Sequence, residues 1–299
     1  MWLLAEARSM GANAVESALA DRVILITGAS AGIGEAVAMA AAVPGATLVL
    51  AARREGILRT IQEVLTHRGC RVLVIPTDMG DPEQVQRLAE QVLATCGRVD
   101  ILVNNAGYGQ MGPLEILPLE AIQRQFQVNV FGVVQLTQAL IPAMRAQKYG
   151  RIINISSVVG QISMPFNGLY SASKHALEAL SDALRVELAP FGIQVVVVEP
   201  GPVATEFFAV AQAQMQTVLP EQHPYGAVIK QDSESTGSLS KNAWRAEQVA
   251  AVILRAMTDP RPAPRYTAFQ GGKSMLALMK VTPAAWMDKF WCRIFQWPE

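Results

Sequence analysis

The amino-acid sequence predicts an α/β fold in which a doubly wound parallel sheet of about seven strands carries helices on both faces. Two patterns lead to this prediction. Short runs rich in valine, isoleucine and leucine recur along the chain, as expected of parallel strands that are buried on both faces. Longer segments with helical spacing separate these runs. Because no linker interrupts the alternation, we expect one domain over residues 21–299, preceded by an N-terminal extension over residues 1–20.

Strand candidates and helix candidates alternate along the chain. The apolar runs are RVILIT, ATLVLAA, RVLVIP, VDILVNN, RIINIS and IQVVVVEP, with a late strand around Arg265 to Phe269. The helical patterns between them are IGEAVAMAAAV, EGILRTIQEVLTHR, PEQVQRLAEQVLATC and the segments 119–147 and 169–189. Repeated strand–helix–strand units place successive strands parallel to one another, so the sequence indicates a single-domain, Rossmann-like sheet.

Composition argues against several classes of protein. The 299 residues include 25 basic and 25 acidic side chains without a strongly basic stretch, so nucleic acid is not an expected partner. The three cysteines lie far apart, are odd in number and do not form a cluster with the histidines, which predicts no disulfide and no metal site and favours a reducing, cytoplasmic location. The apolar start MWLL is followed at once by charges, and no apolar run reaches the roughly 18 residues of a membrane span. We therefore expect neither a signal peptide nor a transmembrane segment.

A glycine-rich turn follows the first strand candidate. In TGASAGIG, residues 27–34, the glycines Gly28, Gly32 and Gly34 permit a tight turn that leads directly into a helix. Backbone amides at a helix N-terminus bind pyrophosphate well, so this turn indicates a dinucleotide site. The spacing is G-x-x-x-G-x-G, and the alternative is a strand-to-helix turn that needs glycine for steric reasons alone.

Tyr170 and Lys174 lie four residues apart in YSASKHALEAL, so both side chains project from one face of a predicted helix. A tyrosine has an ordinary pKa of about 10, and a neighbouring ammonium lowers that pKa because it favours the phenolate. Ser157 follows the strand candidate RIINIS, where a parallel sheet opens on a ligand crevice. Together these side chains can polarise a carbonyl oxygen and deliver a proton to it. Tyr-x-x-x-Lys spacing also occurs by chance on helices, and the remaining motifs decide between the two interpretations.

Three further polar residues lie at informative positions. Asp78, after the third strand, can accept a hydrogen bond from an adenine amino group, or it can cap the helix that begins near Pro82. Asn105 belongs to NNAG at the end of the fourth strand, which suits either the approach of a cofactor or a plain turn. Asn129 lies inside an apolar helical pattern, where asparagine is unfavourable, so it either holds a water or bends the helix.

Taken together, these motifs resemble those of the short-chain dehydrogenase/reductase family, over residues 21–269. TGASAGIG, NNAG, the Asn-Ser-Tyr-Lys set and the PG-x-x-x-T of residues 200–205 follow one another in the family's order, and the combination is highly specific. Within the family, PFNGLYSASKHALEAL, an arginine after the second strand and PRY near the end are most similar to the 17β-hydroxysteroid and retinol dehydrogenase branch.

The resemblance implies a role for each candidate side chain. Tyr170 would be the general acid and base, and Lys174 would lower its pKa and bind the nicotinamide ribose. Ser157 would hold the substrate oxygen, and Asn129 would position a water in a proton relay to Lys174. The residues implied in cofactor binding are Gly28, Ser30, Gly32, Ile33, Gly34, Arg53, Asp78, Asn105, Lys174 and Thr205, with Asp78 at the adenine and Thr205 at the carboxamide.

The end of the second strand, LVLAARRE, predicts NADP rather than NAD as the cofactor. An enzyme that prefers NAD typically has Asp or Glu there, and that carboxylate would repel a 2′-phosphate. This chain has Arg53 and Arg54 instead, and Arg53 matches the family position that contacts the phosphate. Alternatively, both arginines are solvated or pair with Glu55. Ala31 also lacks a phosphate contact that many NADP-preferring relatives have, so NAD is the alternative cofactor.

Two segments near the end of the chain favour a lipophilic substrate. Residues 206–243 begin with an apolar helical stripe and continue into KQDSESTGSLSK, which is polar and is predicted to be mobile. We interpret this segment as a substrate lid, and the alternative is that the apolar stripe belongs to a core helix. The tail, residues 275–299, carries three tryptophans and would pack on the body or on another subunit, with a membrane surface as the alternative. The stripe, together with Met164 and Phe166, favours a steroid-, retinoid- or long-chain-like substrate.

The sequence therefore predicts an NAD(P)-dependent oxidoreductase that transfers a hydride between nicotinamide and a small-molecule alcohol and its ketone or aldehyde. One alternative is an epimerase or dehydratase, whose first turn usually has the spacing G-x-x-G-x-x-G. Another is a non-catalytic nucleotide-sensing or scaffold protein, which would be expected to lack one of Ser157, Tyr170 and Lys174. The resemblance also implies a homodimer or homotetramer, in which the helices that begin near Leu119 and Leu169 pair between subunits.

Overall fold

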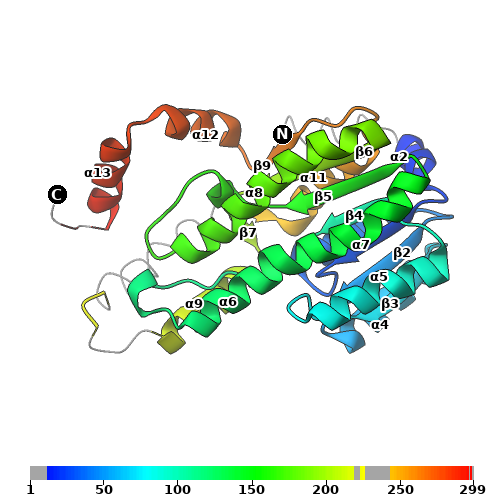
Figure 1. The fold of residues 1–299 in the computed structure, drawn as a ribbon, viewed down its shortest axis with the longest axis horizontal. Helices are drawn as coiled ribbons and strands as arrows, with labels where there is room; N and C mark the ends of the chain where they lie inside the picture. The colour runs from blue at the N-terminus through cyan, green and yellow to red at the C-terminus, as the bar shows by residue number, and fades with distance from the viewer. Residues whose placement is uncertain (1–11, 219–222, 226–242, 296, 298–299) are drawn as a thin grey trace.

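The computed structural model describes residues 12–218, 223–225, 243–295 and 297 (Figure 1). Its central feature is a parallel seven-stranded sheet with the order β3-β2-β1-β4-β5-β6-β9. The strands are β1 (Val23–Thr27), β2 (Thr47–Ala52), β3 (Arg71–Pro76), β4 (Ile101–Asn104), β5 (Gly150–Ile155), β6 (Ile193–Pro200) and β9 (Arg265–Ala268). All seven coincide with predicted strands, and the doubly wound, Rossmann-like α/β fold is confirmed.

The strand order reverses at β1. The chain moves outward from β1 to β2 and β3, and it then returns to place β4 on the other side of β1. The two connections that leave the neighbouring strands β1 and β4 therefore run in opposite directions and leave a crevice between them. In open α/β sheets ligands bind in this crevice, beyond the carboxyl ends of the strands.

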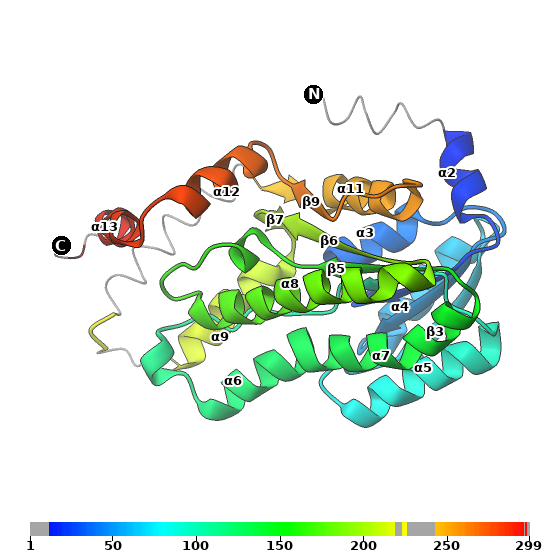
Figure 2. The same ribbon diagram turned by 45° about the horizontal axis from the view of Figure 1, so that its top comes forward.

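Helices cover both faces of the sheet (Figure 2). One face is covered by α3 (Gly32–Ala40), α4 (Glu55–Thr66) and α11 (Ala246–Thr258), and the other by α5 (Pro82–Cys96), α7 (Gly132–Ala146) and α8 (Gly168–Leu188). Strand β2 demonstrates why both layers are needed, because Leu48 and Leu50 belong to the first core whereas Val49 belongs to the second. Every residue of such a strand needs an apolar neighbour, which explains the uninterrupted apolar runs in the sequence.

The described part of the predicted extension is the helix α2 (Ala12–Leu19), which lies near the amino ends of the strands. Leu19 is fully buried and belongs to the first core, and Val15 packs against the same cluster. This part of the extension is therefore packed against the body of the fold.

The segment 119–147 is not one continuous helix. It consists of α6 (Leu119–Phe126), a wider π-helical turn η2 (Gln127–Phe131) and α7. Asn129 lies in this turn, so the expectation that it bends the helix agrees with the structure. Gly132 follows directly and packs against the chain after β3, because a Cβ at this position would collide with the carbonyl oxygen of Met79.

Several of the elements that follow β6 lie at the carboxyl end of the sheet. They are the two-stranded pair β7 (Val203–Ala204) and β8 (Trp244–Arg245), the helix α9 (Glu206–Val218), and α12 (Gly272–Val281) with α13 (Ala284–Ile294). Both views show α12 and α13 extending away from the sheet at the end of the molecule opposite to α2. The stretch KQDSESTGSLSK lies outside the described residues. Among the helices of the described ranges, none has the length and apolar character needed to cross a membrane.

Candidate active site

A cavity of about 1660 Å³ lies beyond the carboxyl ends of the strands. It extends from the β1–α3 turn, past the ends of β4 and β5, to α9 and the helices α12 and α13. The predicted site residues that line it are Gly28, Ser30, Gly32, Ile33, Arg53, Asp78, Asn105, Ser157, Tyr170, Lys174 and Thr205. Gly34 and Asn129 do not line this cavity. The fold thus brings most of the predicted residues to one place, as the strand order predicts.

The β1–α3 turn forms a cradle that only glycine permits at several positions. Gly28 and Gly32 have φ values of 66° and 56°, in the left-handed region that disfavours side chains. A Cβ on Gly34 would collide with the carbonyl oxygen of Gly28 and the amide of Asn105, so this glycine allows α3 to approach the strand. No side chain caps the N-terminus of α3, whose first residue is Gly32. Its amide groups therefore suit the pyrophosphate of a dinucleotide, and the turn fits such a cofactor.

Thr27 and Asn105 hold this turn in place across the switch point. The Asn105 side-chain amide donates to the carbonyl oxygens of Thr27 at 2.9 Å and Gly28 at 3.3 Å. The Thr27 hydroxyl accepts from the backbone amides of Asn105 and Ala106, both at 3.0 Å. Asn105 thus shapes the turn between β1 and the loop after β4. Thr27 is not among the site residues predicted from the sequence, although its position as the first residue of TGASAGIG is a signal for this role.

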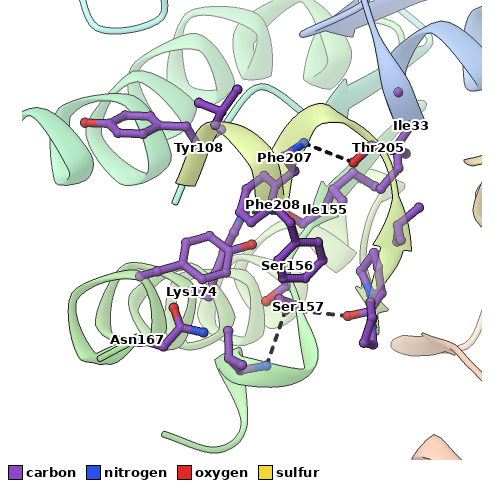
Figure 3. A pocket seen from close by; sticks show the side chains of 18 of the residues that line it. Ile33, Tyr108, Ile155, Ser156, Ser157, Asn167, Lys174, Thr205, Phe207 and Phe208 are labelled. Carbon is purple, nitrogen blue, oxygen red and sulfur yellow. Dashed lines mark hydrogen bonds between the residues drawn. The ribbon is translucent and has the colours of Figure 1, made fainter. Parts of the chain in front are cut away.

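Ser157, Tyr170 and Lys174 converge from two elements. Ser157 follows β5, whereas the other two residues come from the first turns of α8 and are almost fully buried. The Lys174 ammonium donates to the Ile155 carbonyl oxygen at 2.8 Å and lies 5.7 Å from the centre of the Tyr170 ring. The Ser157 hydroxyl lies 3.5 Å from the Pro200 carbonyl oxygen. Figure 3 shows Ser157, Lys174 and Thr205 around the same cavity.

Burial controls the protonation of this group. It raises the pKa of Tyr170, and a hydrogen bond with Ser157 only partly opposes this effect. The net shift is therefore opposite in direction to the one expected from the Lys174 charge. Burial also lowers the pKa of Lys174 to about 8, although the Glu178 carboxylate opposes the change. At neutral pH the structure therefore holds a protonated phenol beside a lysine that is still mostly charged.

Asn129 acts on the loop after β4. Its side-chain oxygen accepts from the Tyr108 backbone amide at 3.1 Å, and its side-chain amide donates to the Tyr108 carbonyl oxygen at 2.9 Å. The same amide donates to the Ser173 hydroxyl at 3.2 Å. Asn129 thus ties the loop that borders the cavity to α8, one residue before Lys174. Its role in a proton relay stays a prediction.

Asp78 does not cap the helix that follows it. Asp81 is the N-cap of α5 and accepts hydrogen bonds from the backbone amides of Glu83 and Gln84, so the capping alternative for Asp78 is wrong. Asp78 itself accepts from the Gly80 backbone at 2.8 Å and from Arg124 at 2.5 Å. Burial alone would raise the pKa of Asp78, but these two hydrogen bonds hold it below the ordinary value. An ionised acceptor therefore faces the cavity.

Arg53 and Arg54 differ in their contacts. Arg54 donates to the Ser30 hydroxyl at 3.2 Å and to its carbonyl oxygen at 3.1 Å, and it pairs with Glu206 at 3.4 Å. Glu55 pairs with Arg59 instead of either arginine. Within the part of the chain that the structure describes, the Arg53 guanidinium makes no hydrogen bond and no ion pair, and it lines the cavity. Arg53 is thus available for an anionic ligand, whereas Arg54 is held to the glycine-rich turn.

Phe207 and Phe295 line the apolar far end of the cavity, whereas Met215 and Phe166 are not among its lining residues. The Phe207 ring on α9 lies 5.3 Å from the Tyr170 ring, and Met215 on the same helix is buried. The Phe166 ring lies 5.3 Å from that of Phe295, which is buried at the end of α13. Part of the tail therefore packs on the body of the protein, as expected. Phe207 and Met215 belong to the apolar stripe predicted at the start of residues 206–243. Of its other members, Phe208 and Val210 are exposed, and the side chains of Val218 and Leu219 lie outside the described residues.

Comparison with known proteins assigns the chain to a family. A sequence model described as short chain dehydrogenase matches residues 22–216, which include the glycine-rich turn, NNAG and the Ser157, Tyr170 and Lys174 set. The chain therefore belongs to the short-chain dehydrogenase/reductase family, as the motifs predicted.

Individual relatives resemble the chain over most of its length. Retinol dehydrogenase 8 of Bos taurus is 33% identical over 295 residues, which cover 94% of this chain and 92% of the relative. An NADPH-dependent 3-dehydrocapnine reductase of Ornithobacterium rhinotracheale is 32% identical over 90% of this chain and 95% of its own length. A short-chain dehydrogenase/reductase from Burkholderia phymatum, solved in complex with NAD, superposes with a TM-score of 0.76 at 30% identity and covers 87% of this chain and 93% of that one.

Proposed function

We propose that this protein is an NADP-preferring oxidoreductase that transfers a hydride between nicotinamide and a lipophilic alcohol or its ketone or aldehyde. The observation that carries the proposal is that Ser157, Tyr170 and Lys174 line the same cavity as the glycine-rich turn. A proton donor and a dinucleotide cradle in one cavity are what carbonyl reduction requires. Because all three catalytic side chains are present, the non-catalytic alternative has no support in the site.

The cofactor would lie along the crevice between β1 and β4. The amides of the turn from Gly28 to Gly34 would hold its pyrophosphate, Asp78 would accept from its adenine, and Thr205 would contact its carboxamide. When bound, nicotinamide supplies or accepts the hydride. The protein's own contribution is to orient the cofactor and the substrate oxygen in a cavity with apolar walls.

The side chains around the substrate oxygen then move one proton. The Ser157 hydroxyl donates a hydrogen bond to the substrate carbonyl oxygen, and the Tyr170 phenol delivers its proton to that oxygen as the carbonyl carbon receives the hydride. The Lys174 charge stabilises the phenolate that forms. In the oxidation direction the phenolate takes up the alcohol proton. The raised pKa of Tyr170 keeps the phenol protonated, which supports reduction at neutral pH.

The free guanidinium of Arg53 supports NADP over NAD. A guanidinium binds phosphate with charge-assisted hydrogen bonds, and bonds to charged groups contribute roughly 1.5 to 3 kcal/mol. Arg53 lines the cavity beside Asp78 at the end that would hold the adenosine. Among the relatives, one is NADPH-dependent and another was solved with NAD, so the family includes both cofactors.

The apolar wall around Phe207 and Phe295 supports a lipophilic substrate. Both rings line the cavity and have aromatic neighbours, and Met275 and Met279 on α12 line the same cavity. Burying apolar surface contributes about 25 cal/mol per Å², so an extended hydrocarbon would gain affinity there whereas a sugar would not. We favour a steroid-, retinoid- or long-chain-like molecule, and α9 would close over it as a lid.

Two exposed apolar surfaces support contacts outside the site. The tail surface, made of Leu278, Val281, Trp286, Phe290 and Ile294, is exposed on α12 and α13, which carry four basic side chains and one acidic one. We assign this surface to peripheral contact with an anionic membrane. The helix surface, made of Leu119, Phe131 and Val186, is assigned to a homodimer or homotetramer contact. Three free cysteines support a cytoplasmic location.

Replacing Tyr170 with phenylalanine tests the assignment of the proton donor. Tyr170→Phe should lower kcat by about 10² to 10⁴, because the phenylalanine keeps the ring but lacks the proton. The dissociation constant of NADP, measured by fluorescence titration, should change little. Lys174→Ala should impair both quantities, since the lysine is assigned to catalysis and to cofactor binding. Wild-type turnover in Tyr170→Phe would refute the mechanism.

Replacing Arg53 with aspartate tests the cofactor preference. Arg53→Asp should lower kcat/KM for NADP by about tenfold to a hundredfold, because a phosphate contact is lost and a repulsive charge is introduced. The value for NAD should be little changed. Arg59→Asp is the matched control, since Arg59 is exposed and does not line the cavity. An unchanged ratio of NADP to NAD efficiency in Arg53→Asp would rule out this role.

A panel of carbonyl substrates tests the apolar pocket. Bulky apolar ketones and aldehydes should have higher kcat/KM than hydrophilic ones. Phe207→Ala should reduce that advantage by roughly tenfold, since burying a phenylalanine side chain contributes about 1.5 to 3 kcal/mol. Val64→Ala, at an exposed position away from the cavity, serves as the control. Better turnover of sugars than of apolar carbonyls would show that the pocket has been misassigned.

Reciprocal variants test the two surfaces. Trp286→Ser should reduce flotation with vesicles of anionic phospholipid by about tenfold but leave the particle mass in light scattering unchanged. Phe131→Ser should lower the particle mass but leave flotation unchanged. The membrane assignment fails if wild-type protein does not float with the vesicles. The subunit assignment fails if wild-type protein has the mass of one chain.

A further inference from the structure

A cluster of charged side chains, two of them buried carboxylates, lies next to Lys174 and does not line the cavity. Glu178 follows Lys174 by one turn of α8 and is 5% exposed. Its carboxylate accepts from Arg265 on β9 at 3.0 Å. Arg265 also pairs with Asp182 at 2.6 Å and lies 3.6 Å from a carboxylate oxygen of Glu199 on β6. The cluster thus joins α8 to the last two strands of the sheet.

Glu199 adds a second buried carboxylate to the cluster. It is 3% exposed, and its two oxygens accept from Gln161 at 3.0 Å and from Thr267 at 3.2 Å. Both donors are neutral, so they form hydrogen bonds with Glu199 but do not neutralise its negative charge. Arg265 is therefore the guanidinium shared by the buried carboxylates Glu178 and Glu199, and it is also paired with Asp182.

The backbone of Gly160 packs against both Glu178 and Lys174 where α8 meets the loop after β5. Gly160 fills this point, and a Cβ there would lie 2.6 Å from the Ser156 hydroxyl, 3.1 Å from Cγ of Glu178 and 3.3 Å from Cβ of Lys174. Ser156 is itself buried. Glu178 and Lys174, one turn apart on α8, are therefore both enclosed, and charges in an enclosed region act on each other more strongly than they do in water.

The charges form a sequence from β9 to the catalytic lysine. Burial lowers the pKa of Lys174, and the Glu178 carboxylate is the charge that opposes this change. Burial raises the pKa of Glu178 in turn; Ser156 and Arg265 favour its ionised form, whereas Glu199 disfavours it. On α8, Tyr170 lies one turn before Lys174 and Asp182 lies one turn after Glu178, His175 follows Lys174 directly, and Arg185 pairs with Asp182. Arg265 thus favours a charged Glu178, and a charged Glu178 favours a charged Lys174.

We propose that Glu178 is a positioning residue that keeps Lys174 as an ammonium in the buried site, and that Arg265 keeps Glu178 ionised for this purpose. The effect of Glu178 on the charge of Lys174 is inferred from this cluster alone, whereas the consequence of that charge for turnover rests on the proposed function. Strand β9 thereby contributes to the active site without touching the substrate.

The direct test follows the charge of Lys174 in the protein without cofactor. Protein labelled with ¹³C-lysine is titrated by NMR, and the Lys174 signal is assigned by its absence in Lys174→Ala. Glu178→Gln should lower the Lys174 midpoint by about one pH unit, because the glutamine keeps the shape but lacks the charge. Asp182→Asn is the matched control: it also removes a carboxylate partner of Arg265 from α8, and it should leave the midpoint in place.

A second variant approaches the same lysine from outside α8. Arg265→Gln should also lower the Lys174 midpoint, because Glu178 then becomes protonated more readily. The double variant should shift the midpoint no further than Glu178→Gln does, since both changes act through one carboxylate. An unchanged Lys174 midpoint in either folded single variant, with folding checked by circular dichroism, overturns the proposal.

The pH dependence of turnover links the cluster to catalysis. Glu178 raises the pKa of Lys174, so removing the Glu178 charge lowers that pKa. As the pH rises, Lys174 then loses its proton earlier, and activity should be lost at a lower pH in the variant than in the wild type. The alkaline limb of kcat/KM should therefore move toward acid by the same amount as the NMR midpoint. A shifted midpoint with an unshifted limb would uphold the electrostatic role of Glu178 but contradict the proposed function of Lys174. Equal shifts would support both.

Discussion

A buried ammonium group governs the arrangement around the cavity. Lys174 is 5% exposed, and removing a charge from water is costly unless neighbouring groups compensate for it. The compensation comes from the Ile155 carbonyl oxygen at the end of β5 and from the Glu178 carboxylate on α8. The hydrogen bond to Ile155 fixes the first turns of α8 against the carboxyl end of β5, which sets where the Tyr170 phenol lies. The position of the Tyr170 proton donor thus depends on the contacts that offset the free-energy cost of burying the Lys174 charge.

The cofactor half of the site depends on a different constraint, namely the close approach of backbone to backbone. Gly34 lets α3 approach the Gly28 carbonyl, and Thr27 and Asn105 then join the turn to the loop after β4. Asn129 continues this connection, because it binds the backbone of Tyr108 and the hydroxyl of Ser173 next to Lys174. A continuous set of hydrogen bonds and packing contacts therefore relates the cradle to the catalytic helix.

Local patterns in the sequence were sufficient for the strands and for most of the site. Buried parallel strands need continuous apolar runs, and their carboxyl ends meet at one edge, so Ser157, Asn105 and the glycine-rich turn could be placed together. Three-dimensional burial was not visible in this way, and it reversed the expected pKa shift of Tyr170. Likewise, two aspartates close in sequence competed for the cap of α5, and Gly132, next to the wider turn at Asn129, packs against Met79 from a distant part of the chain. The contact between Arg265 and Glu178 joins residues 87 positions apart, which no local pattern reveals.

Isotope transfer tests the central claim most directly, because it follows the hydride itself. The protein is supplied with a lipophilic aldehyde and NADPH deuterated at either hydrogen of C4, in ordinary water, and the alcohol is analysed by mass spectrometry. The account predicts one deuterium on the carbinol carbon from one of the two labelled cofactors, with the hydroxyl proton coming from solvent through Tyr170. Alcohol that forms without deuterium from either labelled cofactor would contradict the account.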